Sequence, residues 1–183
     1  MIHKFPKVLR RLLKWFWRRK YFFTLLFTIN FLIWIFCLPE QLFSEPTCTV
    51  LKDKTGAILG ARIADDGQWR FPPSHSVPDK FERAIIEFED RDFKSHSGIS
   101  FKAFGRAIKQ NISEGKVVSG GSTITMQTIR LSRKGRSRSY WEKLIEVYMS
   151  TRLEWRLTKG EILRLYASNA PMGGNVVGVE AAS

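Results

Sequence analysis

The sequence predicts a mainly α-helical domain that is preceded by one transmembrane helix and a small N-terminal β element. Three observations predict it: an uncharged stretch at 21–38, alternating apolar residues around turn signals at 47–71, and helical spacing of apolar residues from 78 onward. With 183 residues, 44% of them hydrophobic, the chain can bury one core and is too apolar for a disordered protein. Two cysteines are too few for a disulfide scaffold or a four-cysteine zinc site.

The N-terminal 38 residues predict a membrane anchor. Residues 1–20 carry eight Lys or Arg and no acidic residue, within a net charge of +13. Such an arm can bind nucleic acid, but the uncharged stretch that follows would span about 27 Å as a helix, close to a bilayer core. The positive-inside rule then makes 1–20 a basic cytoplasmic tail and 21–38 a transmembrane signal-anchor. A cleaved signal peptide is disfavoured because 35–39 offers no small-x-small site, and a buried core helix because of the eight charges.

Residues 39–76 predict a juxtamembrane β-hairpin segment. Strands are expected at 48–52, 58–63 and 68–71, separated by turn signals that each end in glycine, as a hairpin or meander.

Residues 77–183 predict a helical domain. Five helix starts are expected, at Pro78, Ser100, Ser122, Ser139 and Thr158. The last two are followed three residues later by Glu, which predicts capping boxes. A glycine-rich loop is expected after Pro171, and another helix begins at the end of the chain.

An acidic cluster at 87–92 is the first candidate for chemistry. A carboxylate in apolar surroundings suits a general base. The alternative is a solvated face in which Glu87 and Asp92 pair with Arg91 and Lys94. HExxH, CxxC, P-loop and GxSxG patterns are missing, which leaves zincin, redox, nucleotide-binding and serine-hydrolase classes without support.

The stretch 130–143 is the second candidate, with six cations and one acidic residue. It predicts a mobile loop that attracts pyrophosphate and anionic lipid headgroups; a solvated loop without a ligand is the alternative. The apolar residues Phe101, Phe104 and Val117-Val118 are compatible either with contact to the outer leaflet or with ordinary packing.

Five patterns occur in a fixed order: Glu89-Asp90-x-x-Phe93-x-x-His96-x-Gly98, GGSTITMQ at 120–127, Lys143-x-x-Glu146, Lys159-x-x-Ile162-Leu163-x-x-Tyr166, and a glycine-rich pattern at 173–182. Together they resemble the signatures of the peptidoglycan glycosyltransferases, glycosyltransferase family 51, which form a domain of the class A penicillin-binding proteins. Met126 and residues 68–72 are most similar to the 1C type.

The resemblance implies a lysozyme-like helical fold and a defined reaction. The family polymerises lipid II into glycan strands with inversion and releases undecaprenyl pyrophosphate, as part of cell-wall biosynthesis. The similarity covers 81–182, so we expect a glycosyltransferase domain that is incomplete at its C-terminal end. The expected location is the bacterial inner membrane, with a single pass, the N-terminus in the cytoplasm and the catalytic part periplasmic.

The resemblance also implies residue roles. Glu89 would be the catalytic base, and Glu146 would act at the pyrophosphate, as a ligand of a divalent cation (Mg²⁺ or Mn²⁺) or by orienting Lys143. Substrate-binding or supporting roles fall to Asp90, Phe93, His96, Ser122, Thr123, Gln127, Arg130, Lys143 and Arg152. Lys159 and Tyr166 are expected to be structural.

The implied partners are lipid II, the growing glycan strand, the membrane and other cell-wall synthesis proteins, and no nucleic acid. Two other functions stay open: a non-catalytic membrane-tethered binding or assembly module, and a lysozyme-like wall-cleaving enzyme.

Overall fold

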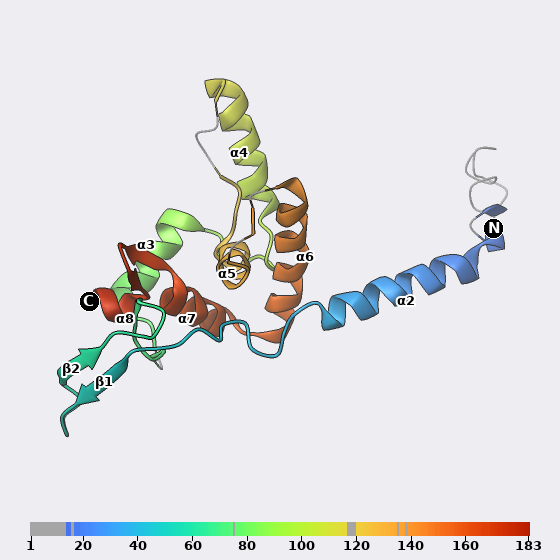
Figure 1. The fold of residues 1–183 in the computed structure, drawn as a ribbon. Helices are drawn as coiled ribbons and strands as arrows, with labels where there is room; N and C mark the ends of the chain where they lie inside the picture. The colour runs from blue at the N-terminus through green and yellow to red at the C-terminus, as the bar shows by residue number, and fades with distance from the viewer. Residues whose placement is uncertain (1–13, 16, 75, 117–119, 135, 138) are drawn as a thin grey trace. The chain divides into compact units, whose positions relative to one another are not determined.

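A computed structural model describes residues 14–15, 17–74, 76–116, 120–134, 136–137 and 139–183 (Figure 1). The chain divides into two compact units, and the boundary along the sequence lies between Cys37 and Leu38. Most of the predicted basic tail, as well as Val117, Val118 and Arg138, lies outside the described residues.

The first unit contains helix α2, Lys20–Phe36, whose side chains are mostly exposed. The helix has 17 residues and ends before Cys37 and Leu38, the last two residues of the predicted span. Among the residues that the structure describes, no helix is both long and apolar enough to cross a membrane. The transmembrane helix predicted at 21–38 is therefore not confirmed.

The second unit begins with the predicted hairpin. Strands β1, Thr49–Lys52, and β2, Ile58–Arg62, pair antiparallel. The Asp53 carboxylate accepts the backbone N–H groups of Thr55 and Ala57, which fixes the turn between them. The hairpin prediction is confirmed, and its turn is held by a local side chain.

The third predicted strand does not continue the hairpin into a meander. Strand β3, Trp69–Arg70, pairs in parallel with β5, Val176–Val177, which also pairs antiparallel with β4, Pro171–Gly173. The region after Pro171 is thus a short strand pair rather than a plain loop. The strand at β3 was predicted, but its pairing with β5 joins residues about a hundred positions apart, so the local pattern could not predict this partner.

All five predicted helices are present. They are α3, Asp79–Glu89; α4, Phe101–Glu114; α5, Ile124–Ser132; α6, Tyr140–Arg156; and α7, Lys159–Asn169, followed by the single turn α8, Val179–Ala182. The mainly helical fold class is confirmed.

The helix caps agree with the sequence except at two starts. Thr158 forms the predicted capping box. At α6 the Ser139 hydroxyl accepts the N–H of Glu142, but the Glu142 carboxylate turns to Arg133 and does not close the box. Helix α5 is capped by Thr123, one residue later than predicted, which leaves the hydroxyl of the preceding serine available for other contacts.

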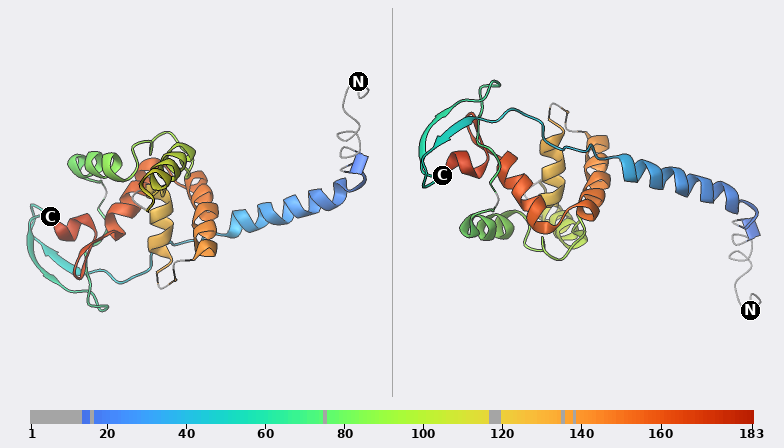
Figure 2. Two further views of the ribbon diagram at one scale, coloured as in Figure 1. Left: turned by 90° about the horizontal axis from the view of Figure 1, so that it is seen from above. Right: turned by 90° about the horizontal axis from the view of Figure 1, so that it is seen from below.

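Helix α5 is the centre of the second unit and packs between α6 and α7 (Figure 2). Its Ile124 and Ile129 are fully buried, together with Leu153 of α6 and Ile162 of α7. The loop before α4 comes close to α6: Gly98 has φ +91°, and an added Cβ would lie 2.8 Å from the Ser150 carbonyl oxygen. Only glycine fits this crossing.

Helix α4 stands apart from this core, as Figure 1 shows. Its large apolar residues are exposed, with Phe101 81% and Ile112 76% accessible, whereas Ala107 is buried. Phe101 is therefore not packed in the core, whereas Phe104 lies against Gly121, so neither interpretation of this face is decided.

Candidate active site

Glu89 is the last residue of α3 and is half-buried. It lines a hollow of about 290 Å³ together with Arg106 and Gln110 of α4. Its Oε2 atom accepts a hydrogen bond from Nε2 of Gln127, on α5, at 2.6 Å. The proposed base thus has one oxygen attached to the central helix and lies beside open space.

The next residue, Asp90, is buried, with its side chain only 2% exposed. Its Oδ2 lies 2.9 Å from His96 Nε2 and accepts the Ile124 backbone N–H at 3.0 Å. This N–H belongs to the first turn of α5, where backbone donors lack helical partners and a negative charge is stabilising. Asp90 and His96 therefore join the end of α3 to the start of α5 and fix the backbone next to Glu89.

Thr123 and Phe93 also belong to the supporting structure. The Thr123 hydroxyl donates to the Gly98 carbonyl at 2.7 Å and accepts the Met126 N–H. Phe93 is 1% exposed, and Lys159 Nζ lies 4.5 Å from the centre of its ring. Substrate contact, which the resemblance implied for both, would require their present partners to move.

Lys159 ties the first motif to α6. Its ammonium donates to the His96 carbonyl at 2.6 Å and to Glu154 Oε1 at 2.7 Å, and the same Glu154 oxygen accepts from Thr125. This agrees with the structural role expected for Lys159. Glu154 was missed by the sequence reasoning, because nothing in its neighbourhood along the chain distinguishes it from a solvated helix residue.

The outer acids of the cluster form exposed ion pairs. Glu87 pairs with Arg91 at 2.7 Å, as the solvated-face alternative predicted. Asp92 pairs with Lys102 instead of Lys94. The cluster therefore separates into a solvated outer part and the inner residues Glu89 and Asp90.

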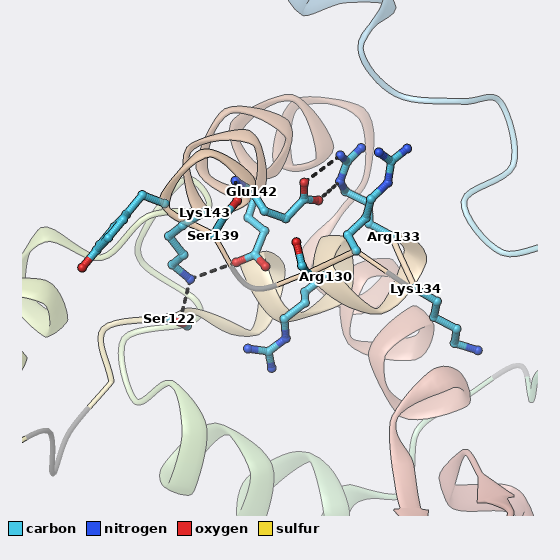
Figure 3. A pocket seen from close by; sticks show the side chains of 11 residues that line it. Ser122, Arg130, Arg133, Lys134, Ser139, Glu142 and Lys143 are labelled. Carbon is cyan, nitrogen blue, oxygen red and sulfur yellow. Dashed lines mark hydrogen bonds and ion pairs between the residues drawn. The ribbon is translucent and has the colours of Figure 1, made fainter.

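A second, larger cavity of about 820 Å³ lies between α5 and α6 (Figure 3). Its lining comes from the residue before the α5 cap, the C-terminal end of α5, the connection to α6 and the first turns of α6: Ser122, Arg130, Arg133, Lys134, Arg136, Ser137, Ser139, Tyr140, Glu142, Lys143 and Glu146. Five of the six cations of the predicted basic stretch thus line a common space, and the sixth, Arg138, lies outside the described residues; this favours the anion-binding interpretation over a solvated loop without a ligand.

Lys143 connects the motifs in this cavity. Its Nζ donates to Ser122 Oγ at 2.8 Å and to Glu146 Oε2 at 2.9 Å (Figure 3). Glu146 is 7% exposed at its side chain, whereas Lys143 is 43% exposed. The carboxylate therefore orients an ammonium group that remains accessible from the cavity.

Arg133 and Glu142 form a bidentate ion pair in the same cavity. The hydrogen bond from Arg133 lowers the pKa of Glu142, and the same bond raises the pKa of Arg133. Of the other cations, Lys134 pairs with Glu45 at 3.1 Å. The sequence analysis assigned Arg133 to the group of cations that attract an anion, but it gave no signal for the ion pair between Arg133 and Glu142.

The donor set around Glu146 does not fit a protein-held divalent cation. Such a cation prefers several oxygen ligands, but the described contact of Glu146 is the Lys143 ammonium. Among the described residues, no three His, Cys, Asp or Glu side chains are grouped to hold a metal ion.

Among the described residues, Glu89 and Lys143 line separate hollows. Arg130 of the larger cavity donates to Gln127 Oε1 at 3.4 Å, and Gln127 in turn contacts Glu89. Burial and the charge of Glu89 raise the pKa of Tyr166, an effect that Arg130 opposes. Helix α5 thus connects the two hollows through Gln127 and Arg130.

Arg152 is half-buried on α6 and is not among the described residues that line either hollow. Tyr140, which the sequence reasoning did not select, is 93% exposed at the edge of the larger cavity. Neither position was indicated by spacing within a motif.

The sequence model of the transglycosylase family matches residues 56–183. Penicillin-binding protein 1C of Escherichia coli K12 is 41% identical over 124 residues, which cover 67% of this chain and 16% of that protein. Penicillin-binding protein 1A of Pseudomonas aeruginosa is 35% identical over 126 residues, 68% of this chain and 15% of that protein. The chain thus spans about one sixth of the length of these two relatives.

The biosynthetic peptidoglycan transglycosylase of Herminiimonas arsenicoxydans is 32% identical over 182 residues, which cover 97% of this chain and 76% of that protein. Both the family match and this long alignment include the two hollows and the helices between them. The chain therefore belongs to the transglycosylase family.

Proposed function

We propose that this chain is a peptidoglycan glycosyltransferase that polymerises lipid II into glycan strands. The observation that carries the proposal is the connection, through α5, of a partly solvated carboxylate at Glu89 with a cavity lined by cations. Membership of the transglycosylase family supports the same reaction class.

Glu89 would act as the general base. The 4-hydroxyl oxygen of the acceptor GlcNAc attacks C1 of the donor MurNAc, and the hydroxyl proton passes to the Glu89 carboxylate. A sugar hydroxyl is a weak acid, so its attack requires such a base. One-step displacement with a carboxylate base on the attacking side gives inversion, as in the inverting glycosidases.

The larger cavity would hold the leaving group. As the bond between C1 and the phosphate oxygen breaks, the electron pair leaves with undecaprenyl pyrophosphate. Fixed cations at the place where negative charge develops lower the barrier. Lys143, oriented by Glu146, and Arg130 are the groups assigned to this charge, and the remaining cations contribute to the field.

Because lipid II is embedded in a membrane, the proposal places the reaction at the outer face of the bacterial inner membrane. This part of the proposal depends on the substrate and not on helix α2.

An assay with labelled lipid II tests the function. Formation of polymer supports transfer, and shortening of preformed glycan indicates a wall-cleaving enzyme. If the chain does neither, a tethered binding module is indicated.

Glu89→Gln is the sharpest variant in this assay. It keeps the side-chain shape but removes the base, so polymer formation should fall about 10³-fold, within the usual range for general-base catalysis, while lipid II binding is retained. Glu82→Gln is the matched control, since Glu82 lies on the same helix and pairs with Lys94 away from the hollow. Unaltered rates in Glu89→Gln would refute the assignment of the base.

A further inference from the structure

We infer that Gln127 is a positioning residue for Glu89, and not primarily a substrate ligand as the sequence suggested. Gln127 fixes one carboxylate oxygen and leaves the other for the acceptor hydroxyl. The inference rests on the proposed function, because it assigns Glu89 the role of base.

The two ends of the Gln127 amide have different partners. Nε2 donates to Glu89 Oε2 at 2.6 Å, and Oε1 accepts from Arg130 at 3.4 Å. An ionised carboxylate only accepts and a guanidinium only donates, so this orientation of the amide is the one that satisfies both neighbours. A flipped amide would place its oxygen against the Glu89 carboxylate, two acceptors, and its NH₂ against the Arg130 guanidinium, two donors.

The helix that carries Gln127 is rigidly held. The Gln127 N–H donates to the Thr123 carbonyl at 2.9 Å, in the first turn of α5. The neighbouring side chains of Met126 and Thr128 are buried in the core. A side chain anchored on such a helix can hold its partner in one position, which the end of α3 alone cannot do.

The second carboxylate oxygen of Glu89, Oε1, is available to a substrate. Oε1 has no hydrogen-bond partner among the described residues, and it is not a buried unsatisfied atom. The backbone on its C-terminal side is fixed by Asp90, through His96 and Ile124. With the backbone and Oε2 both held, Oε1 is the oxygen that receives the proton, and its placement depends on Gln127.

Steady-state kinetics with labelled lipid II test the inference. In Gln127→Leu, which keeps the bulk but loses the donor, kcat should fall about 10²-fold, because misplacing a reacting group by about 1 Å has an effect of this size. KM should change by less than about threefold, because the lost contact is to the base and not to the substrate. A rise in KM with kcat unchanged would overturn the inference in favour of a substrate ligand.

Two more variants sharpen this test. Gln127→Glu keeps the shape and the acceptor for Arg130 but places two carboxylates side by side, so kcat should fall at least as far as in Gln127→Leu. Gln41→Leu makes the same amide-to-leucine change outside both hollows and should leave kcat and KM unaltered. Normal kcat in Gln127→Glu contradicts the inference.

A thermodynamic cycle separates this inference from the proposed function. If the unaltered chain makes no polymer, the proposed function fails, and unfolding of Glu89→Ala, Gln127→Leu and the double variant still tests the contact. The effects on the unfolding equilibrium constant should be non-additive by about tenfold, as for a hydrogen bond to a charged group. Additive effects would show that Gln127 does not hold Glu89.

Discussion

The buried network around Asp90 and the cation-lined cavity both adjoin helix α5, but they differ in how accessible their charged groups are. Around Asp90, each charge meets a partner inside the protein: His96, the α5 backbone, and Lys159 with Glu154. In the cavity, Lys143 is 43% exposed and Arg136 makes no hydrogen bond or ion pair with a described residue.

This difference teaches which motif residues set geometry and which are available for a ligand. Burying a charge is costly unless it is paired, so a buried and fully paired group stabilises one arrangement of the chain. An accessible cation retains its capacity to bind an anion. The same family signatures thus contain both kinds of residue.

The largest expected effect is on the buried side. Asp90→Ala leaves His96 and the Ile124 N–H without their acceptor, so the free energy of unfolding should drop by about 3 kcal/mol, as for other broken buried pairs. Urea unfolding measures it. Asp92→Ala, two residues away, removes an exposed ion pair with Lys102 and should cost less than about 0.5 kcal/mol. If both variants lose the same free energy of unfolding, the buried and solvated parts of the cluster do not differ in their contribution to stability.

In the cation-lined cavity, substitutions should change activity rather than stability. Lys143→Met removes the cation assigned to the leaving group, so kcat/KM for lipid II should fall about 10²-fold, as when one donor to a developing charge is lost. Arg136→Ala removes a cation that contributes only to the field, and its effect should be below about tenfold and should fade as salt rises. If both variants behave alike at every salt concentration, Lys143 has no direct role.

The smallest effect concerns pH. The hydrogen bond from Arg133 lowers the pKa of Glu142 below its ordinary value of 4.5. A carboxyl group with a lowered pKa in the folded state stabilises the fold above its ordinary pKa, and this contribution is lost as pH falls through the folded value. The melting temperature should therefore drop less between about pH 6 and pH 3 in Glu142→Gln than in the unaltered chain. An identical drop in both would show that the pair adds no stability.

Features within a few residues of one another could be read from the sequence. The serine at 100 and the threonine at 158 cap their helices as predicted, because a cap depends on the N–H groups two or three residues ahead. The hairpin at β1 and β2 follows from its turn. The order of the five patterns indicated the family, which the comparisons confirm.

Other features required the fold. The Glu142 carboxylate accepts hydrogen bonds from Arg133 instead of closing a capping box, because a guanidinium group forms a stronger bond with a carboxylate than a backbone N–H does. The placing of Glu89 and Lys143 in two separate hollows depends on how the helices pack, and the pairing of β3 with β5 joins segments that are distant in sequence.

By itself, the sequence determined the helices and the first hairpin, since these depend on local spacing and residue type, while its resemblance to a family supplied the candidate site residues. Only the tertiary structure decided which of those residues are buried and paired and which are accessible. The bond between Gln127 and Glu89 joins residues 38 positions apart, and its existence depends on how α3 and α5 pack. Contacts over such separations are selected by the packing of the whole core, which no local pattern records.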